Sequence, residues 1–320
     1  MSKLKLIISM VIFGTIGIFV KYIPLSTTIL ALARGVIGTV FLLLVVAFSK
    51  KKISLTAIKR NMFLLICSGI AIGVNWIFLF ESYRHTTVAT ATLCYYLAPV
   101  FVILLSPIIL KEKLTARKIL CVIAALAGMV FVSGILQNSS NSEIGLKGIL
   151  FGICAAVFYA GVVLMNKFLK DISANDSTIM QLGIAAIVLL PYTLMTENPK
   201  AVTLTVPVIL LLVTVGILHT GIAYSLYFAS MSGLNGQTIA IFSYIDPAVA
   251  ILLSMFLLKE SMDVLSMIGA VLILGATLFS ELLCRPVNNF KQVEKNSIIG
   301  SSRDILIRKG VDCEKKIKKY

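Results

Sequence analysis

Two charged side chains and one histidine lie inside long apolar segments of this sequence. Arg34 occurs in the run Ala-Leu-Ala-Arg-Gly, Asp246 directly precedes Pro247, and His219 follows Val-Gly-Ile-Leu. Ionisable groups in such segments are costly, so they usually face a partner or a polar cavity. A guanidinium can hold a carboxylate through two parallel hydrogen bonds. A carboxyl group or an imidazole can bind an amine or carry a proton.

Each of these three residues also has a structural interpretation. Arg34 could pair with a carboxylate between two helices or extend toward a membrane surface. Asp246 could be the counter-ion of Arg34, and His219 could be hydrogen-bonded only to its neighbours. We predict Arg34 as a substrate-binding candidate, and Asp246 and His219 as candidates for coupling or proton relay.

Aromatic and amide side chains form a second group of candidates. Tyrosine combines an apolar ring with a hydroxyl group, which suits a ligand of mixed character. We predict that these residues line one central cavity together with Arg34: Asn75, Trp76, Tyr95, Tyr96, Tyr159, Tyr224 and Tyr244. Packing between helices, or a place at the membrane surface, is the alternative for each of them.

The amino-acid composition predicts that these residues lie within a membrane protein. Of the 320 residues, 58% are hydrophobic and 13% are charged, whereas a soluble domain is about 45–50% apolar and about 25% charged. A helix needs about 20 apolar residues to cross the hydrocarbon core. We therefore predict an all-α integral membrane protein with ten transmembrane helices in the lipid bilayer: 4–20, 28–48, 62–81, 86–110, 116–134, 147–168, 176–195, 207–230, 236–258 and 263–283.

Basic residues are unevenly shared between the two sides of these predicted spans. One side carries Lys3, Lys5, Lys50, Lys51, Lys52, Lys59, Arg60, Lys111, Lys113, Arg117, Lys118, Lys167 and Lys170. The other side carries Lys21, Arg84, Lys147, Lys200 and Lys259. The positive-inside rule then predicts that both termini are cytoplasmic, in a multi-pass protein of the plasma membrane. The net charge of +15 is an orientation signal on this interpretation, and nucleic acid is not a predicted partner.

The sequence offers little for catalysis, cofactors or metals. No two of the six cysteines are spaced as CxxC, and the two histidines lie in different predicted spans. We find no glycine-rich phosphate loop with a lysine and predict no cofactor, no metal site and no enzyme. A membrane-embedded enzyme acting on a lipid-linked substrate, or a channel, remains the alternative.

The chain repeats itself after 148 residues. This shift places Ile103-Leu-Leu-Ser-Pro-Ile-Ile-Leu-Lys-Glu112 on Ile251-Leu-Leu-Ser-Met-Phe-Leu-Leu-Lys-Glu260, with seven of ten positions identical. The same shift pairs Tyr96 with Tyr244 and Pro99 with Pro247. Chance similarity between apolar segments would not keep such residues in register.

The repeat predicts two halves of five helices each. We expect a first repeat at 1–136, a polar linker at 137–146, a second repeat at 147–284 and a basic cytoplasmic tail at 285–320. Because five is odd, the second half must enter the membrane in the opposite orientation. Inverted repeats of this kind are common in secondary transporters, where two halves rock about a central site.

Particular residues in this frame resemble the EamA family of the drug/metabolite transporter superfamily. They are Arg34 early in the second span, Pro99 in Leu-Ala-Pro-Val, Glu112 in Leu-Lys-Glu, and the second-half motifs at Pro247 and Glu260. The similarity covers roughly residues 4–283. One departure is the absence of a counterpart to Arg34 in the seventh span, so a site built on Arg34 would be asymmetric.

The resemblance implies movement of small metabolites, such as amino acids, often outward, through a cavity lined by both halves. Such movement would be uncoupled or linked to protons. We therefore predict a secondary transporter whose partners are a small-molecule substrate, the bilayer and, on the second alternative, protons. Close glycines such as Gly69 and Gly73 favour packing within the bundle, although a homodimer stays open.

Overall fold

The computed structural model of the chain describes residues 1–49, 53–86, 88–132, 146–197, 204–257 and 264–283. Its regular structure there is helical. The elements are α1 (Ser2–Lys21), α2 (Thr27–Phe48), α3 (Leu55–His85), α4 (Val88–Tyr95), α5 (Ala98–Ile109), α6 (Ala116–Val132), α7 (Leu146–Asn166), α8 (Ala174–Thr196), α9 (Val206–Thr214), the π-helix η2 (Val215–Ile222), α10 (Ala223–Met231), α11 (Gly236–Phe242), α12 (Ile245–Leu257) and α13 (Val264–Leu283).

Several helices are long and apolar enough to cross a membrane. Six such segments occur within the described part of the chain: Ser2–Phe19, Thr27–Phe48, Leu55–His85, Leu146–Asn166, Ala174–Thr196 and Val206–Met231. One face of α2 exposes Val36, Val40, Leu43 and Leu44, each by 41–51%. Their spacing of three and four residues forms one apolar stripe along the helix. In a membrane this stripe would face lipid.

Two of the predicted spans are broken in the middle. The predicted span 86–110 consists of α4 and α5, and 236–258 consists of α11 and α12. Each second piece has a proline in its first turn, Pro99 and Pro247. Proline has no backbone N–H, so the bonds that would reach the carbonyls of Tyr95 and Ser243, four residues earlier, cannot form. Each of these two predicted spans is thus interrupted next to its proline.

The third span begins earlier than predicted, at Leu55 instead of residue 62. Ser54 caps it, since its hydroxyl accepts a hydrogen bond from the amide of Ala57 at 3.3 Å. Two polar side chains of its second turn have partners: Arg60 pairs with Asp171 at 2.7 Å, and Asn61 donates to the carbonyl of Lys170 at 2.8 Å. The basic residues Lys59 and Arg60 therefore belong to the start of the helix and not to the loop before it.

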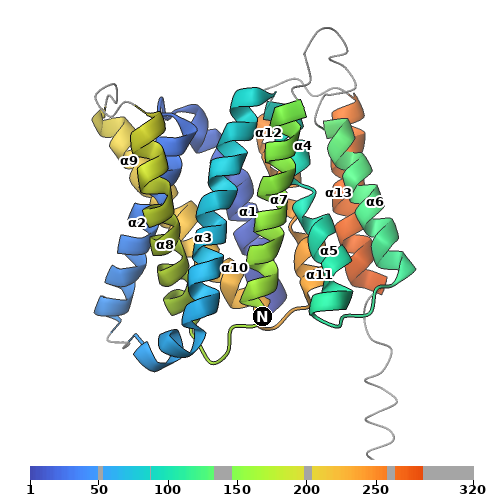
Figure 1. Cartoon of the computed structure of the whole chain (residues 1–320). Coiled ribbons are helices and arrows are strands. Elements are labelled where there is room, and N and C mark those ends of the chain that lie inside the picture. The colour runs from blue at the N-terminus through green and yellow to red at the C-terminus, as the bar shows by residue number, and fades with distance from the viewer. Residues whose placement is uncertain (50–52, 87, 133–145, 198–203, 258–263, 284–320) are drawn as a thin grey trace, which may run out of the picture. The chain divides into compact units, whose positions relative to one another are not determined.

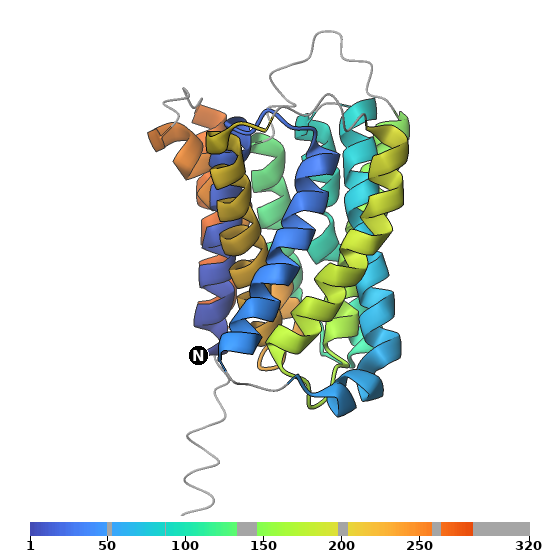
Figure 2. The ribbon, with the colours of Figure 1, turned by 90° about the vertical axis from the view of Figure 1, so that its left-hand side faces the viewer.

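Helices that are distant in sequence pack side by side (Figure 1). α3 packs against α7 and α8, and α1 packs against α10 and α12. Figure 2 shows α2 between α8 and the segment that begins with α9, in agreement with its contacts to α8, α9 and η2. Helices from the first part of the sequence therefore pack between helices from the second part.

Glycines allow the closest of these approaches. A β-carbon on Gly69 would lie 2.7 Å from the β-carbon of Ile184, and one on Gly73 would lie 2.8 Å from that of Val188. Both contacts join α3 to α8, so this GxxxG pattern packs helices within the chain. The predicted linker up to residue 145 and the predicted tail 285–320 lie outside the described residues.

Candidate functional site

A cavity of about 290 Å³ lies inside the helices. Its walls include residues of α1 from the middle of the helix onward, the first turns of α2 and the last turns of α3. The cavity therefore sits in the half of the bundle away from the start of α1. We call this the distal half, and the half that holds the start of α1 the N-terminal half (Figure 1).

Most of the predicted site residues meet in this cavity, although they come from six different helical segments and the turn after α4. The predicted residues that line it are Arg34, Trp76, Tyr95, Tyr96, Tyr159, Tyr224 and Asp246. Asp246 and Arg34 are 212 positions apart in the chain, so only the fold brings them together.

Arg34 is held along one edge and one face of its guanidinium group. Its Nε donates a hydrogen bond to Oγ1 of Thr220 at 3.2 Å. Its central carbon lies 5.6 Å from the centre of the Trp76 ring, a cation–π distance. Among the described residues, neither terminal nitrogen of Arg34 has a hydrogen-bond or ion-pair partner. The two nitrogens that bind carboxylates in pairs are thus not used by the protein.

Asp246 lies in the first turn of α12, after the helix break. The Tyr96 hydroxyl lies within hydrogen-bonding reach of its carboxylate. Asp246 and Arg34 form no ion pair within 4 Å, although both are described and both line the cavity. The alternative that Asp246 is simply the counter-ion of Arg34 therefore does not hold.

Aromatic rings form the walls between these two charges. Tyr224 meets the Trp76 ring edge-on with centroids 6.3 Å apart, and Tyr95 lies 5.6 Å from Tyr159. The Tyr159 hydroxyl donates to that of Tyr227 at 2.8 Å. Rings and hydroxyls together give a wall that can contact an apolar side chain and a polar group.

Three predicted residues do not line the cavity. Asn75 is buried, and its amide donates to the carbonyl of Ala155 at 2.6 Å, which ties α3 to α7. Tyr244 is fully buried and donates to the carbonyl of Tyr96 at 3.3 Å. His219 is also fully buried, with Nε2 2.8 Å from the hydroxyl of Thr15. These contacts are structural ties.

The sequence analysis missed several lining residues. They are Met10, Phe13, Ile16, Thr27, Leu30, Ala31, Leu79, Phe80, Tyr83, Ala98, Pro99 and Ser243. Most are ordinary apolar residues that no sequence signal distinguishes from core. The shift of 148 residues could have identified three of them, because it pairs Ser243 with Tyr95, Ala98 with Asp246 and Pro99 with Pro247.

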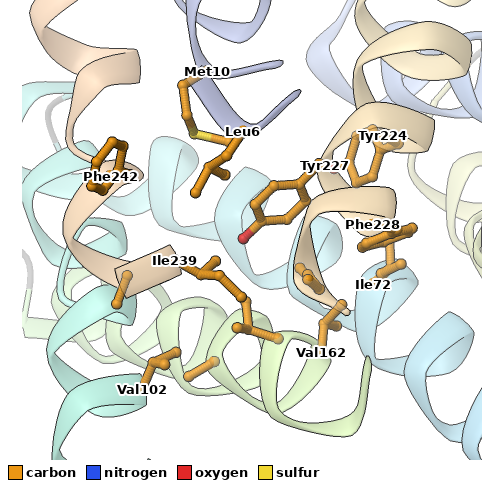
Figure 3. Packing of buried hydrophobic residues seen from close by; sticks show 14 of the residues in the cluster. Leu6, Met10, Ile72, Val102, Val162, Tyr224, Tyr227, Phe228, Ile239 and Phe242 are labelled. Atoms are coloured by element: carbon orange, nitrogen blue, oxygen red, sulfur yellow. The ribbon is translucent and has the colours of Figure 1, made fainter. Parts of the chain in front are cut away.

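The N-terminal half is packed where the distal half is hollow. Figure 3 shows the ring of Tyr227 surrounded by side chains from several helices, among them Leu6 and Met10 of α1 and Ile239 of α11. Tyr227, Leu6 and Ile239 are 0% exposed. A tight apolar layer therefore separates the cavity from the N-terminal end of the bundle.

Polar contacts join helix ends behind this layer. The carboxylate of Glu112 accepts from the amides of Gly236 at 2.6 Å and Gln237 at 3.2 Å, at the start of α11. The Gln237 side chain accepts from Nζ of Lys118 at 2.6 Å and donates to Ser106 at 2.7 Å.

Lys167 forms a similar tie beside them. Its ammonium donates to the carbonyls of Met231, at 2.7 Å, and Leu234, after the end of α10. Burial lowers the pKa of Lys167, and the nearby Glu112 carboxylate opposes that shift. The charged groups of this half are thus used to join helices to one another.

Comparison with known proteins gives a structural match and sequence relatives. A protein of known crystal structure matches with a TM-score of 0.78 over 89% of this chain and 98% of that one, at 18% identity, so it shows the fold alone. Protein PecM of Dickeya dadantii is 28% identical over 67% of this chain and 71% of its own length.

A nearer relative and a family model agree with each other. The uncharacterized transporter YxxF of Bacillus subtilis is 33% identical over 85% of this chain and 86% of its own length. The model of the EamA-like transporter family matches twice, over residues 2–134 and 146–282. The match covers most of the chain, as did the resemblance seen in the sequence. The chain is a multi-pass membrane protein and belongs to the EamA-like transporter family.

Proposed function

We propose that the protein is a secondary transporter that exports amino acids or related zwitterions by alternating access. The observation that carries this proposal is the pair of opposite charges, Arg34 and Asp246, which line one cavity without forming an ion pair. A zwitterion would satisfy both, with its carboxylate on the guanidinium and its ammonium on the carboxylate. The aromatic walls suit the side chain between them.

The proposal includes a ten-helix architecture of two inverted halves, which suits this mechanism. In this proposal α1, α2, α3, α4–α5 and α6 form one half, and α7, α8, α9–η2–α10, α11–α12 and α13 form the other. The shift of 148 residues carries the break after Tyr95 onto position 243, next to the observed end of α11 at Phe242. The halves correspond to the predicted repeats 1–136 and 147–284, joined by 137–146.

Orientation and energy source belong to the same proposal. The uneven distribution of basic residues supports a cytoplasmic position of both termini, and of the tail 285–320, in a plasma-membrane protein. The distal half with its cavity then faces outward, and the packed N-terminal half seals the inner side. Transport would be uncoupled, or linked to protons through Asp246 or, less directly, the buried His219.

Counterflow in proteoliposomes tests the proposal. Purified protein is reconstituted, and exchange is measured with a panel of amino acids, nucleosides and small organic acids. We expect exchange of amino acids, with a loss in Arg34→Ala that is larger for carboxylate-bearing substrates than for uncharged ones. Folded protein that exchanges no member of the panel, or exchanges nucleosides alone, would contradict the proposed substrate class.

A further inference from the structure

The way in which Arg34 is anchored suggests a second residue that decides what the cavity binds. Thr220 accepts from Nε of Arg34 at 3.2 Å, but it is not among the residues that line the cavity. It is 0% exposed, and so lies behind the arginine. The bond engages the edge of the guanidinium group that a bidentate carboxylate leaves free when it binds both terminal nitrogens.

Thr220 reaches Arg34 because two helices approach closely here. A β-carbon on Gly38 of α2 would lie 3.0 Å from the methyl carbon of Thr220. A β-carbon on Gly216 of η2 would lie 2.5 Å from Ile37 of α2. With a glycine on each side of the contact, α2 and η2 pack almost backbone to backbone.

The π-helical turn itself is fixed to a third helix. The hydroxyl proton of Thr15 is used in a 2.7 Å bond to the carbonyl of Ile12. Thr15 must therefore accept in its 2.8 Å contact with Nε2 of His219. Nδ1 of that ring has no partner among the described residues. His219, the residue directly before Thr220, thus connects the π-helix to α1.

We propose that Thr220 is a positioning residue that gives the cavity its specificity for carboxylates, and that the π-helix Val215–Ile222 places it there. A free arginine side chain samples many rotamers, and ordering them costs binding free energy. Thr220 and the Trp76 ring order the guanidinium before a ligand arrives. This inference rests on the proposed function, because it concerns the same cavity and the same zwitterionic substrate.

The test compares a substrate with its carboxyl-blocked analogue. Binding of L-leucine and of L-leucinamide, which keeps the amine but lacks the carboxylate, is measured on purified protein for wild type and Thr220→Val. We expect the Kd for L-leucine to rise about tenfold, because one hydrogen bond to a charged group is lost. The Kd for L-leucinamide should stay unchanged, which also shows that the variant is folded.

Two further variants separate positioning from a structural role. Thr220→Ser keeps the hydroxyl and should bind L-leucine within about twofold of wild type. Thr214→Val, one and a half turns earlier on the same helix, removes an exposed hydroxyl that bonds only to Leu210 and should bind both ligands normally. Equal weakening of both ligands in Thr220→Val, or none, would overturn the assignment.

The outcome also distinguishes this inference from the proposed function. If wild-type protein exchanges no amino acid in the counterflow panel, then the proposed function has failed and Thr220 is not the cause. If another amino acid of that panel binds more tightly than L-leucine, the same comparison is made with it and its amide. If wild type binds the amino acid and Thr220→Val binds it equally well, only the role of Thr220 is wrong.

Discussion

The cavity in the distal half and the packed N-terminal half use their charged side chains in opposite ways. In the distal half, the terminal nitrogens of Arg34 have no partner among the described residues, and Asp246 has only a tyrosine hydroxyl within reach. In the N-terminal half, Glu112, Lys118 and Lys167 each bond to a backbone or amide group of another helix. The cavity leaves these two charges for a ligand, whereas the N-terminal half uses its charges to hold helices together.

This difference indicates what each half does in the conformation described here. Burying a charge without a partner is expensive, so the arrangement in the distal half makes sense if a ligand supplies the missing groups. Satisfied charges at helix ends act instead as ties that can break and re-form. The following substitutions test the contrast, starting with the largest expected effect.

Removing the carboxylate in the distal half should have the largest effect. In Asp246→Asn, we expect amino acid exchange in proteoliposomes to fall about 10- to 100-fold, because a charge-assisted bond to the substrate amine is lost. Asp171→Asn is the matched control, since that carboxylate is 77% exposed and pairs only with Arg60. Normal exchange by Asp246→Asn would remove the carboxylate from the site.

Separating α1 from α12 should have the next largest effect. A β-carbon on Gly14 would lie 2.6 Å from the backbone oxygen of Asp246, so Gly14→Ala must displace α12. We expect a loss of about 1–3 kcal/mol in stability, seen as a lower melting temperature in detergent, together with weaker substrate binding. Gly17→Ala is the control, because nothing lies within 4 Å of a β-carbon there. If the two variants melt alike, the close contact does not matter.

Weakening the tie at Glu112 should loosen the N-terminal half. In Glu112→Gln, the charge that faces the start of α11 is lost, and we expect a single reporter cysteine at the buried position Ile239 to be alkylated up to about tenfold faster. Glu197→Gln serves as the control, because this carboxylate pairs with Arg84 beyond the cavity, in the distal half. A reporter rate that does not change would show that Glu112 does not help to close this half.

The smallest effect should come from the tyrosine pair between the two halves. Tyr159→Phe removes the 2.8 Å bond to Tyr227 but keeps the ring. We expect about 1 kcal/mol, which corresponds to roughly fivefold in Kd for the substrate, with little change in melting temperature. Tyr22→Phe, at a tyrosine that is 61% exposed, is the control. A larger loss would mean that Tyr159 contacts the substrate directly.

The polar character of a residue predicted most of the cavity lining, but it could not separate ligand-binding side chains from those that bond to a neighbouring helix. Arg34, Asp246 and four of the five predicted tyrosines were found because polar groups inside apolar helices usually face a cavity. Asn75 was predicted by the same rule, but its amide is used by the carbonyl of Ala155 on a neighbouring helix. Contacts between distant helices of this kind are not visible in one sequence, so a satisfied amide and a ligand-binding one look alike.

The repeat did not predict which side chains near the helix breaks face the cavity. It pairs Tyr244 with Tyr96, and each of them lies at the break in its own half. Tyr96 lines the cavity, whereas Tyr244 is buried and the neighbouring Ser243 lines it. Likewise, the π-helix changes the angular spacing around His219. Hydropathy predicted the helices, but not these local changes of direction.

The broken helices also limit what side-chain replacement can reveal about this protein. Since Pro99 cannot donate to the carbonyl of Tyr95, one residue of the cavity wall has a backbone oxygen without its regular helical donor. Every amino acid carries that oxygen, so an alanine scan leaves it in place. Residual binding after such a scan is therefore expected. Replacing the backbone amide by an ester weakens the carbonyl as a hydrogen-bond acceptor. This replacement would therefore measure how much the backbone carbonyl contributes to substrate binding.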